Sequence, residues 1–164
     1  MRFSAFIQNS RFSAFIGRFG AFMKGRLHGA FALLLLSAVA GAAGGDTQLP
    51  LHIGPHAFLV EVAATAQQRQ HGLMGRTHLS ADGGMLFVFE RAGRHCFWMR
   101  DTPLPLSIAF IDPAGRIASF ADMQPRSEAL HCSGTDVRYA LEVRQGEFQR
   151  RGIALHAQVN GLPK

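Results

Sequence analysis

The sequence predicts an α+β fold that is mainly antiparallel β, a curled sheet or partly open barrel with one short capped helix over one end. Three observations support this class. Short runs of alternating apolar and polar residues recur after residue 50, turn residues separate them, and one stretch carries a helix-capping signal. We expect about six to eight short strands, mostly joined locally, around one core.

The first 43 residues have a composition of their own. Residues 1–22 contain RFSAFI twice, and we interpret them as upstream sequence before a true start at Met23, or alternatively as a basic amphipathic segment on a membrane surface. Residues 23–43 read as a signal peptide, with a basic start, an apolar run over 30–40 and small residues after it. A spanning helix needs about 20 apolar residues, so cleavage is favoured over an uncleaved inner-membrane anchor.

A linker and first strand are predicted over 44–56, and a single globular domain over 57–160. Within 51–63 we expect two short strands that are broken at Gly54 and Pro55. Thr65 then begins the helix, because its hydroxyl and the Gln68 side chain three residues later form a capping box.

A turn at 82–84 leads into a buried strand over 85–89, and 96–99 reads as a further strand. The clearest prediction is a hairpin of 104–111 with 116–123 around a type I turn at Asp112 to Gly115. In this hairpin, alternate residues from Ile117 to Met123 lie opposite the apolar face of the first strand. A strand over 137–143, a helical turn near 148–151 and a closing segment over 153–159 complete the domain.

Charge excludes one class of partner. The net charge of +6 comes mostly from the leader, because after residue 26 the chain has 12 basic and 11 acidic residues. A nearly neutral domain lacks the basic surface that binds a phosphate backbone, so we expect no nucleic-acid partner. Membrane contact is expected only through the leader.

One set of residues carries a family resemblance. Its members are Arg69, Gly72, Leu73 and Met74, then Gly84 to Phe87, Phe97 to Met99, Thr102, Pro105, Leu106, Ile108, Ala109 and Phe110, and finally Tyr139, Leu141, Glu142 and Gly146. On these residues the chain resembles the family known as domain of unknown function 192. The resemblance implies a compact β-rich domain, often exported, without an established reaction.

The chain departs from the family pattern at Arg100 and Asp101, where the family usually has Lys and Asn, and in its two cysteines. A guanidinium stays protonated and cannot act as a base, which counts against a lysine-dependent enzyme.

The candidate ligand-binding residues surround the WMRDTP segment. Trp98 and Met99 would wall a groove, while Arg100 would hold an anionic ligand through a bidentate contact. The full set is Trp98, Met99, Arg100, Asp101, Thr102 and Glu142. The alternative is structural, with Trp98 in the core, Arg100 at its rim, and Asp101 and Thr102 in a turn. No catalytic residue is assigned, and carboxylates such as Glu61, Glu142 and Glu147 are expected to be solvated.

The two cysteines are predicted to form a disulfide between Cys96 and Cys132, because an exported chain meets an oxidising compartment and no cysteine is left over. The alternative is a soft-metal site for copper or zinc, with His95 and His131 as further ligands. We expect no cofactor and no metal.

The sequence therefore predicts a small exported cell-envelope domain, periplasmic or secreted, that is a ligand-binding or accessory module. The expected partner of this monomer is a small molecule or an envelope protein. The alternative is a cell-envelope hydrolase that uses Glu142 with some of the same residues.

Overall fold

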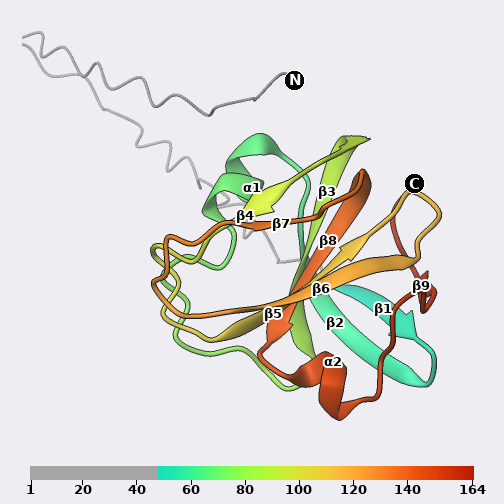
Figure 1. Ribbon diagram of the computed structural model, residues 1–164. Coiled ribbons are helices and arrows are strands. Elements are labelled where there is room, and N and C mark those ends of the chain that lie inside the picture. Colours follow the sequence, from blue (N-terminus) through green and yellow to red (C-terminus); the bar gives the residue numbers. More distant parts are fainter. Residues whose placement is uncertain (1–47) are drawn as a thin grey trace, which may run out of the picture. The chain divides into compact units, whose positions relative to one another are not determined.

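The computed structural model describes residues 48–164 (Figure 1). The predicted upstream sequence, the signal peptide and the start of the linker lie outside these residues. No helix within 48–164 is long and apolar enough to cross a membrane.

Seven strands form one curled sheet in the order β6-β5-β8-β3-β2-β1-β9. They are β1 (Leu49–Ile53), β2 (His56–Ala63), β3 (Gly83–Gly93), β5 (Leu106–Ile111), β6 (Ile117–Met123), β8 (Val137–Arg144) and β9 (Val159–Asn160). Neighbouring strands are antiparallel except β2 and β3, which α1 (Ala66–His71) joins as a parallel pair. A second, two-stranded sheet pairs β4 (Cys96–Phe97) with β7 (His131–Cys132), and α2 (Glu147–Arg150) follows β8. The predicted fold class is confirmed.

The two edges of the curled sheet meet at one end. The amide of Val159 donates to the carbonyl of Gly115 at 2.9 Å, and the amide of His156 donates to the carbonyl of Ile117 at 2.8 Å. An isolated bridge between Arg116 and Gln158 lies in the same place. The sheet is therefore a barrel that closes at the β5–β6 turn and stays open further along β6.

Two apolar clusters cover the two faces of the sheet. The inner cluster lies inside the barrel and includes Leu51, Ile53, Phe58, Val60, Leu86, Ala109, Ile111, Ile117, Tyr139, Leu141, Val143, Phe148, Ile153 and Val159. The outer cluster lies on the opposite face and includes Ala63, Leu73, Leu79, Met85, Phe87, Phe89, Met99, Leu106, Ile108, Phe110, Met123, Val137 and Ala140. Alternate residues of one strand enter different clusters, as the two-residue repeat of a strand requires.

The local predictions for the helix and the hairpin are confirmed. Thr65 caps α1, and both halves of its capping box with Gln68 are present. In the hairpin, Leu106 pairs with Met123 and Ile108 with Ala121, the register that the alternation indicates. Gly115 has a φ of +80° in the turn, a left-handed conformation that glycine adopts without strain.

Three strand predictions were incomplete. β3 is longer than predicted and pairs in parallel with β2, β4 contains only two residues of the predicted 96–99 strand, and β7 lies in a stretch for which no strand was predicted. Periodicity over such short segments carries little information, and β4 and β7 depend on pairing with each other.

Candidate functional site

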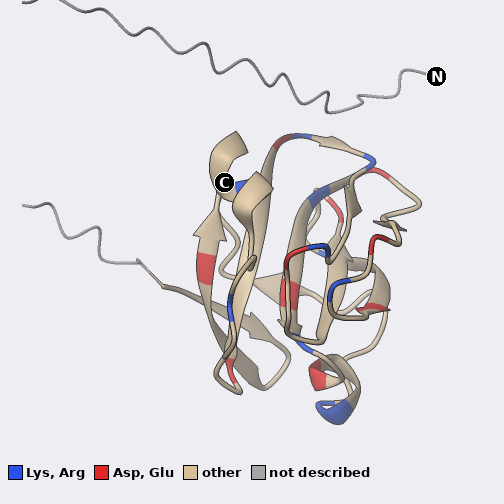
Figure 2. Ribbon diagram, turned by 90° about the vertical axis from the view of Figure 1, so that its left-hand side faces the viewer, with Lys and Arg blue, Asp and Glu red and all other residues tan. Residues whose placement is uncertain are grey.

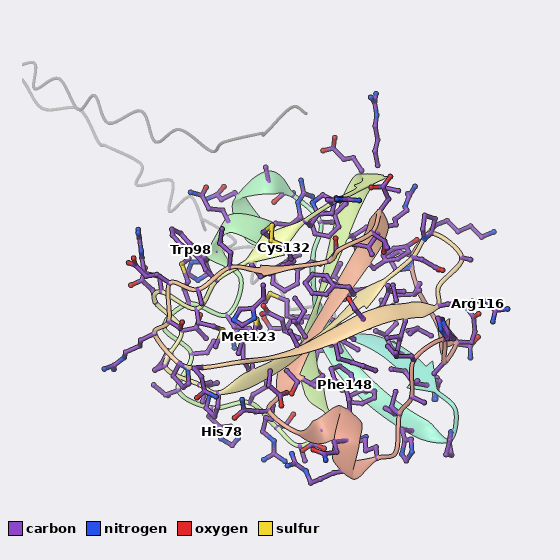
Figure 3. The ribbon with its side chains drawn as sticks, in the orientation of Figure 1. His78, Trp98, Arg116, Met123, Cys132 and Phe148 are labelled. Carbon is purple, nitrogen blue, oxygen red and sulfur yellow. A yellow bond between two sulfur atoms is a disulfide. The ribbon has the colours of Figure 1, made fainter. Side chains whose placement is uncertain are left out.

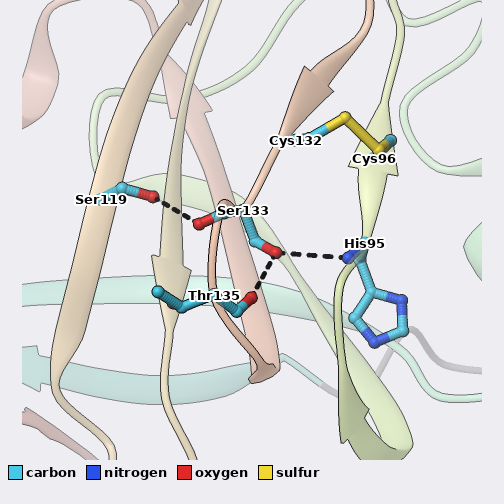
Figure 4. Close-up of a disulfide and its surroundings, with 6 residues drawn as sticks. All are labelled: His95, Cys96, Ser119, Cys132, Ser133 and Thr135. Atoms are coloured by element: carbon cyan, nitrogen blue, oxygen red, sulfur yellow. Dashed lines mark hydrogen bonds between the residues drawn. A yellow bond between two sulfur atoms is a disulfide. The ribbon is translucent and has the colours of Figure 1, made fainter. Parts of the chain in front are cut away.

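The disulfide between Cys96 and Cys132 is present, as predicted, and joins directly opposed residues of β4 and β7. Hydrogen bonds fasten this pair to the domain (Figure 4). The amide of Ser133 donates to the carbonyl of His95 at 3.0 Å, and the Ser133 hydroxyl donates to the carbonyl of Thr135 at 2.6 Å. The Ser119 hydroxyl reaches the Ser133 carbonyl from β6 at 3.4 Å. The β4–β7 pair is therefore cross-linked by the disulfide and bonded to β6 through Ser119, and we call this pair the flap.

The flap has an apolar inner face. Phe97 packs against Phe87 and Phe110, with ring centroids 4.9 and 5.8 Å apart, and so covers part of the outer cluster. His95 stacks on Phe89 with ring centroids 3.4 Å apart. Burial and the nearby Arg69 lower the pKa of His95, against opposing effects of the Arg91 backbone and Asp136. The histidine is therefore a packing residue of the flap.

The outer face of the flap carries Trp98, which is 41% exposed. The guanidinium of Arg100 lies 4.1 Å from the centroid of the Trp98 ring, a cation–π contact. Arg100 in turn donates from Nε to Glu128 at 3.1 Å. Among the described residues this is its one side-chain hydrogen bond, so the terminal nitrogens of Arg100 remain available to an anion.

The other residues of the WMRDTP segment attach it to the domain through buried side chains or backbone hydrogen bonds. Met99 is buried in the outer cluster, and its amide donates to the carbonyl of Ser127 at 2.9 Å. Thr102 is buried, and its amide donates to the carbonyl of Met99 at 3.0 Å. Asp101 is exposed, and its carbonyl accepts from the amide of Gly75 at 2.8 Å. The predicted segment thus divides into exposed Trp98, Arg100 and Asp101 and buried Met99 and Thr102.

Glu142 lies in a different layer from the exposed residues of this segment. It pairs with Met85 on β3 and Ile108 on β5, on the outer face of the sheet, and is 5% exposed. The expectation of a solvated carboxylate was wrong, because β8 lies between two other strands and its outer face is covered. Burial raises the pKa of Glu142 to about 8. Its carboxyl group is therefore mostly protonated at neutral pH.

Glu147 is also buried, at 5% exposed, which corrects the expectation that it is solvated. Burial opposes its ionisation, but hydrogen bonds from Arg150, Arg144 and Arg151 outweigh this effect and lower its pKa to about 2. Arg151 also pairs with Asp82 at 2.6 Å. This group of charges fastens α2 to the start of β3 and is structural.

Two hollows lie away from Trp98. One, of about 370 Å³, is lined by Ser107, Phe120, Ala121, Asp122, Gly146, Phe148, Gln149 and Ile153. The other, of about 200 Å³, contains the Glu61–Arg76 ion pair together with His78 and Ser80. Figure 3 shows Trp98 beside β4 and, further down the view, Phe148, which belongs to α2. The first hollow was not predictable from sequence patterns, because its polar residues come from three separate elements.

The disulfide contradicts the alternative of a copper or zinc site at the two His-Cys pairs. Both sulfur atoms are engaged in the disulfide, so neither cysteine offers a thiolate. No cluster of three or more His, Cys, Asp or Glu residues suited to a metal occurs within 48–164.

Comparisons with known proteins identify relatives without a stated reaction. A family model described as uncharacterised ACR, domain of unknown function 192, matches residues 49–161. A protein from Sinorhizobium meliloti, described as a candidate transcription regulator, has a solved structure that is 34% identical, with a TM-score of 0.66, and the match covers 70% of this chain and 92% of that one. A protein of unknown function from Novosphingobium aromaticivorans is 30% identical, with a TM-score of 0.69 and coverages of 73% and 89%. No curated protein matches.

Proposed function

Because the chain belongs to the family of domain of unknown function 192, in which no reaction is established, we propose a function from the flap: the protein is a small binding module of the cell envelope. Its contact surface is the outer face of the flap with Trp98 and Arg100. The observation that carries this proposal is that Trp98 is exposed, with the Arg100 guanidinium over its ring and Glu128 paired to that guanidinium.

The flap favours binding because it is ordered before a ligand arrives. The disulfide, the buried Met99 and the backbone hydrogen bonds around it restrict the loop that presents Trp98. A surface that is already ordered loses little conformational entropy on binding, which is the advantage of preorganisation. Continuing the register of β4 and β7 places exposed Leu130 opposite Trp98 and extends the apolar surface.

The chemistry of the surface favours an anionic ligand with a flat apolar or ring-shaped part. The ring would stack on Trp98, and an anionic group would accept hydrogen bonds from the free terminal nitrogens of Arg100. An envelope location is part of the proposal, and the disulfide supports it, since disulfides persist in oxidising compartments.

We propose no role on nucleic acid, although one relative is described as a candidate transcription regulator. Acidic and basic residues are interspersed along the ribbon of this domain, so its surface carries charges of both signs (Figure 2). A surface of that kind lacks the charge clustering that phosphate contacts require.

The test uses the only tryptophan of the chain as its own probe. Soluble muropeptides, which combine sugar rings with carboxylates, are titrated into the purified protein while Trp98 emission is followed, and calorimetry measures the same binding. We expect saturable quenching, and a dissociation constant that rises roughly tenfold in Arg100→Gln through loss of a charge-assisted contact.

Arg116→Gln is the matched control, because Arg116 is an exposed arginine at the β5–β6 turn, away from the flap. Its affinity should equal that of the unaltered protein. Unchanged Trp98 emission with no heat of binding would contradict the proposal, as would equal losses in the two arginine variants.

A further inference from the structure

The larger hollow lies where the barrel stays open. Its walls come from β6, from the start of β5 and from the segment 146–153, which contains α2. Its volume of about 370 Å³ is within the range of small-molecule sites, which are often found at the mouths of barrels. None of its lining residues belongs to the flap.

The polar side of the hollow is a carboxylate that is held in place. The Gly146 amide donates to the Ser107 hydroxyl at 2.9 Å, and that hydroxyl donates to Asp122. Ser107 is buried, so its direction is set by these two partners. The second oxygen of Asp122 accepts no hydrogen bond within residues 48–164, and no ion pair of the described residues involves Asp122.

The apolar side of the hollow is aromatic. The rings of Phe120 and Phe148 lie 5.1 Å apart between centroids, at an angle of 42° to each other. Aromatic faces attract cations, and a free carboxylate repels anions. Arg150 lies beside Gly146, and its guanidinium donates to Glu147 at 2.8 Å and to the carbonyl of Gln145 at 3.0 Å. Asp122 is the one charged side chain among the residues that line the hollow, so the charge of the lining itself is negative.

We propose that this hollow is a second binding site, for an organic ammonium ion that has an apolar body. The ammonium group would donate to the free oxygen of Asp122, and the apolar body would pack against Phe120, Phe148 and Ile153. This site is separate from the flap in position and opposite to it in the charge it selects.

Nuclear magnetic resonance of the purified protein tests the proposal with three probes of similar size. These are 2-phenylethylamine, the neutral 2-phenylethanol and the anionic phenylacetate. We expect the amine to shift the amide signals of β6 and of residues 146–153 saturably, the alcohol to bind roughly tenfold more weakly, and phenylacetate to leave these signals unchanged.

Asp122→Asn should remove the preference for the amine, since the amide oxygen still accepts from Ser107 but the charge is gone. Glu90→Gln, a change at an exposed carboxylate of β3, is the matched control and should keep the preference. Phe120→Leu should weaken binding of the amine a fewfold, and binding of the alcohol should change less.

The proposal is overturned if the amine and the alcohol bind equally, if phenylacetate binds more tightly than the amine, or if no probe shifts signals at this hollow. It is also overturned if Asp122→Asn and Glu90→Gln behave alike. None of these outcomes bears on the flap, because the readout follows β6 and α2 and not Trp98.

Discussion

Two regions of the domain each bury a glutamate, and they treat it in opposite ways. Glu142, in the middle of the sheet, and Glu147, at the start of α2, are both 5% exposed. The pKa of Glu142 is raised to about 8 by burial, whereas that of Glu147 is lowered to about 2 because hydrogen bonds from three arginines outweigh the desolvation of its carboxyl group. The charge of a buried acid therefore depends not on its exposure alone but also on the hydrogen-bonding and charged partners that surround it.

Because the pKa values of the two glutamates are shifted in opposite directions, their contributions to stability change with pH in opposite directions. Glu142 keeps its proton in the folded protein and loses it on unfolding between pH 4.5 and about 8, so its contribution to stability falls as pH rises through that window. Glu147 is ionised when folded down to about pH 2, so its contribution is lost as pH falls from 4.5 towards 2. Together they favour a stability maximum near pH 4 to 5.

The largest expected effect comes from loosening the cover of the Glu142 region. The double change Cys96→Ser with Cys132→Ser removes a link across 36 residues, and we expect the free energy of unfolding to fall by about 4 kcal/mol through the gain of unfolded-state entropy. Denaturant unfolding measures it, with the reduced unaltered protein as the control.

The same change should also lower the pKa of Glu142, since Phe97 of the flap packs on Phe87 and Phe110, which flank Ala140, the next residue of β8 on the same face as Glu142. Carboxyl carbon shifts followed against pH would report this. A Glu142 titration that does not move in the double variant would show that the flap does not keep water from the region.

The second-largest effect is expected when Glu142 is replaced by a residue that cannot ionise. Glu142→Gln should raise the free energy of unfolding by roughly 3 kcal/mol at pH 7, because the amide is never ionised. At pH 4 both proteins carry a neutral side chain, and their stabilities should agree. Thermal unfolding across this pH range measures the difference, and a gain that is the same at pH 4 and pH 8 would contradict the explanation by ionisation.

The smallest effect is expected for Glu147, the buried glutamate that is paired with arginines. Glu147→Gln should lower the free energy of unfolding by roughly 2 kcal/mol at pH 7. This figure is smaller than the full pKa shift implies, because Arg144 and Arg150 are partly exposed and solvent screens their charges. The loss should become smaller as pH falls towards 2. Glu128→Gln, which breaks the exposed ion pair with Arg100, is the control and should cost under about 1 kcal/mol. Equal costs for the two variants would refute the role of burial.

The sequence was informative where the determinants are local. The capping box of Thr65 and Gln68, the β5–β6 register and the turn at Gly115 each depend on neighbours a few residues away. The disulfide was predictable from the number of cysteines and the inferred compartment, without knowledge of the fold.

The candidate site was only partly predictable. The sequence identified Trp98 and Arg100, but it missed Glu128 and Leu130, which reach them through the pairing of β4 with β7. It grouped Glu142 with Arg100, although one is buried in the sheet and the other is exposed on the flap. Asp122 and Ser107 gave no signal, because separate hydroxyl and acidic residues are common in any chain, and Gly146 entered only through the family resemblance, without a role at a site. Such sites depend on strand order, which periodicity does not determine.

The pairing of β1 with β9 bears on how the protein is synthesised. The first strand of the barrel pairs with β9 across most of the domain sequence, and residues 156–159 also bond to the β5–β6 turn. A nascent chain that ends before residue 156 lacks every one of these contacts. The barrel can therefore close only after residues 156–160 have been synthesised, and a nascent chain that has reached only β8 is incompletely folded.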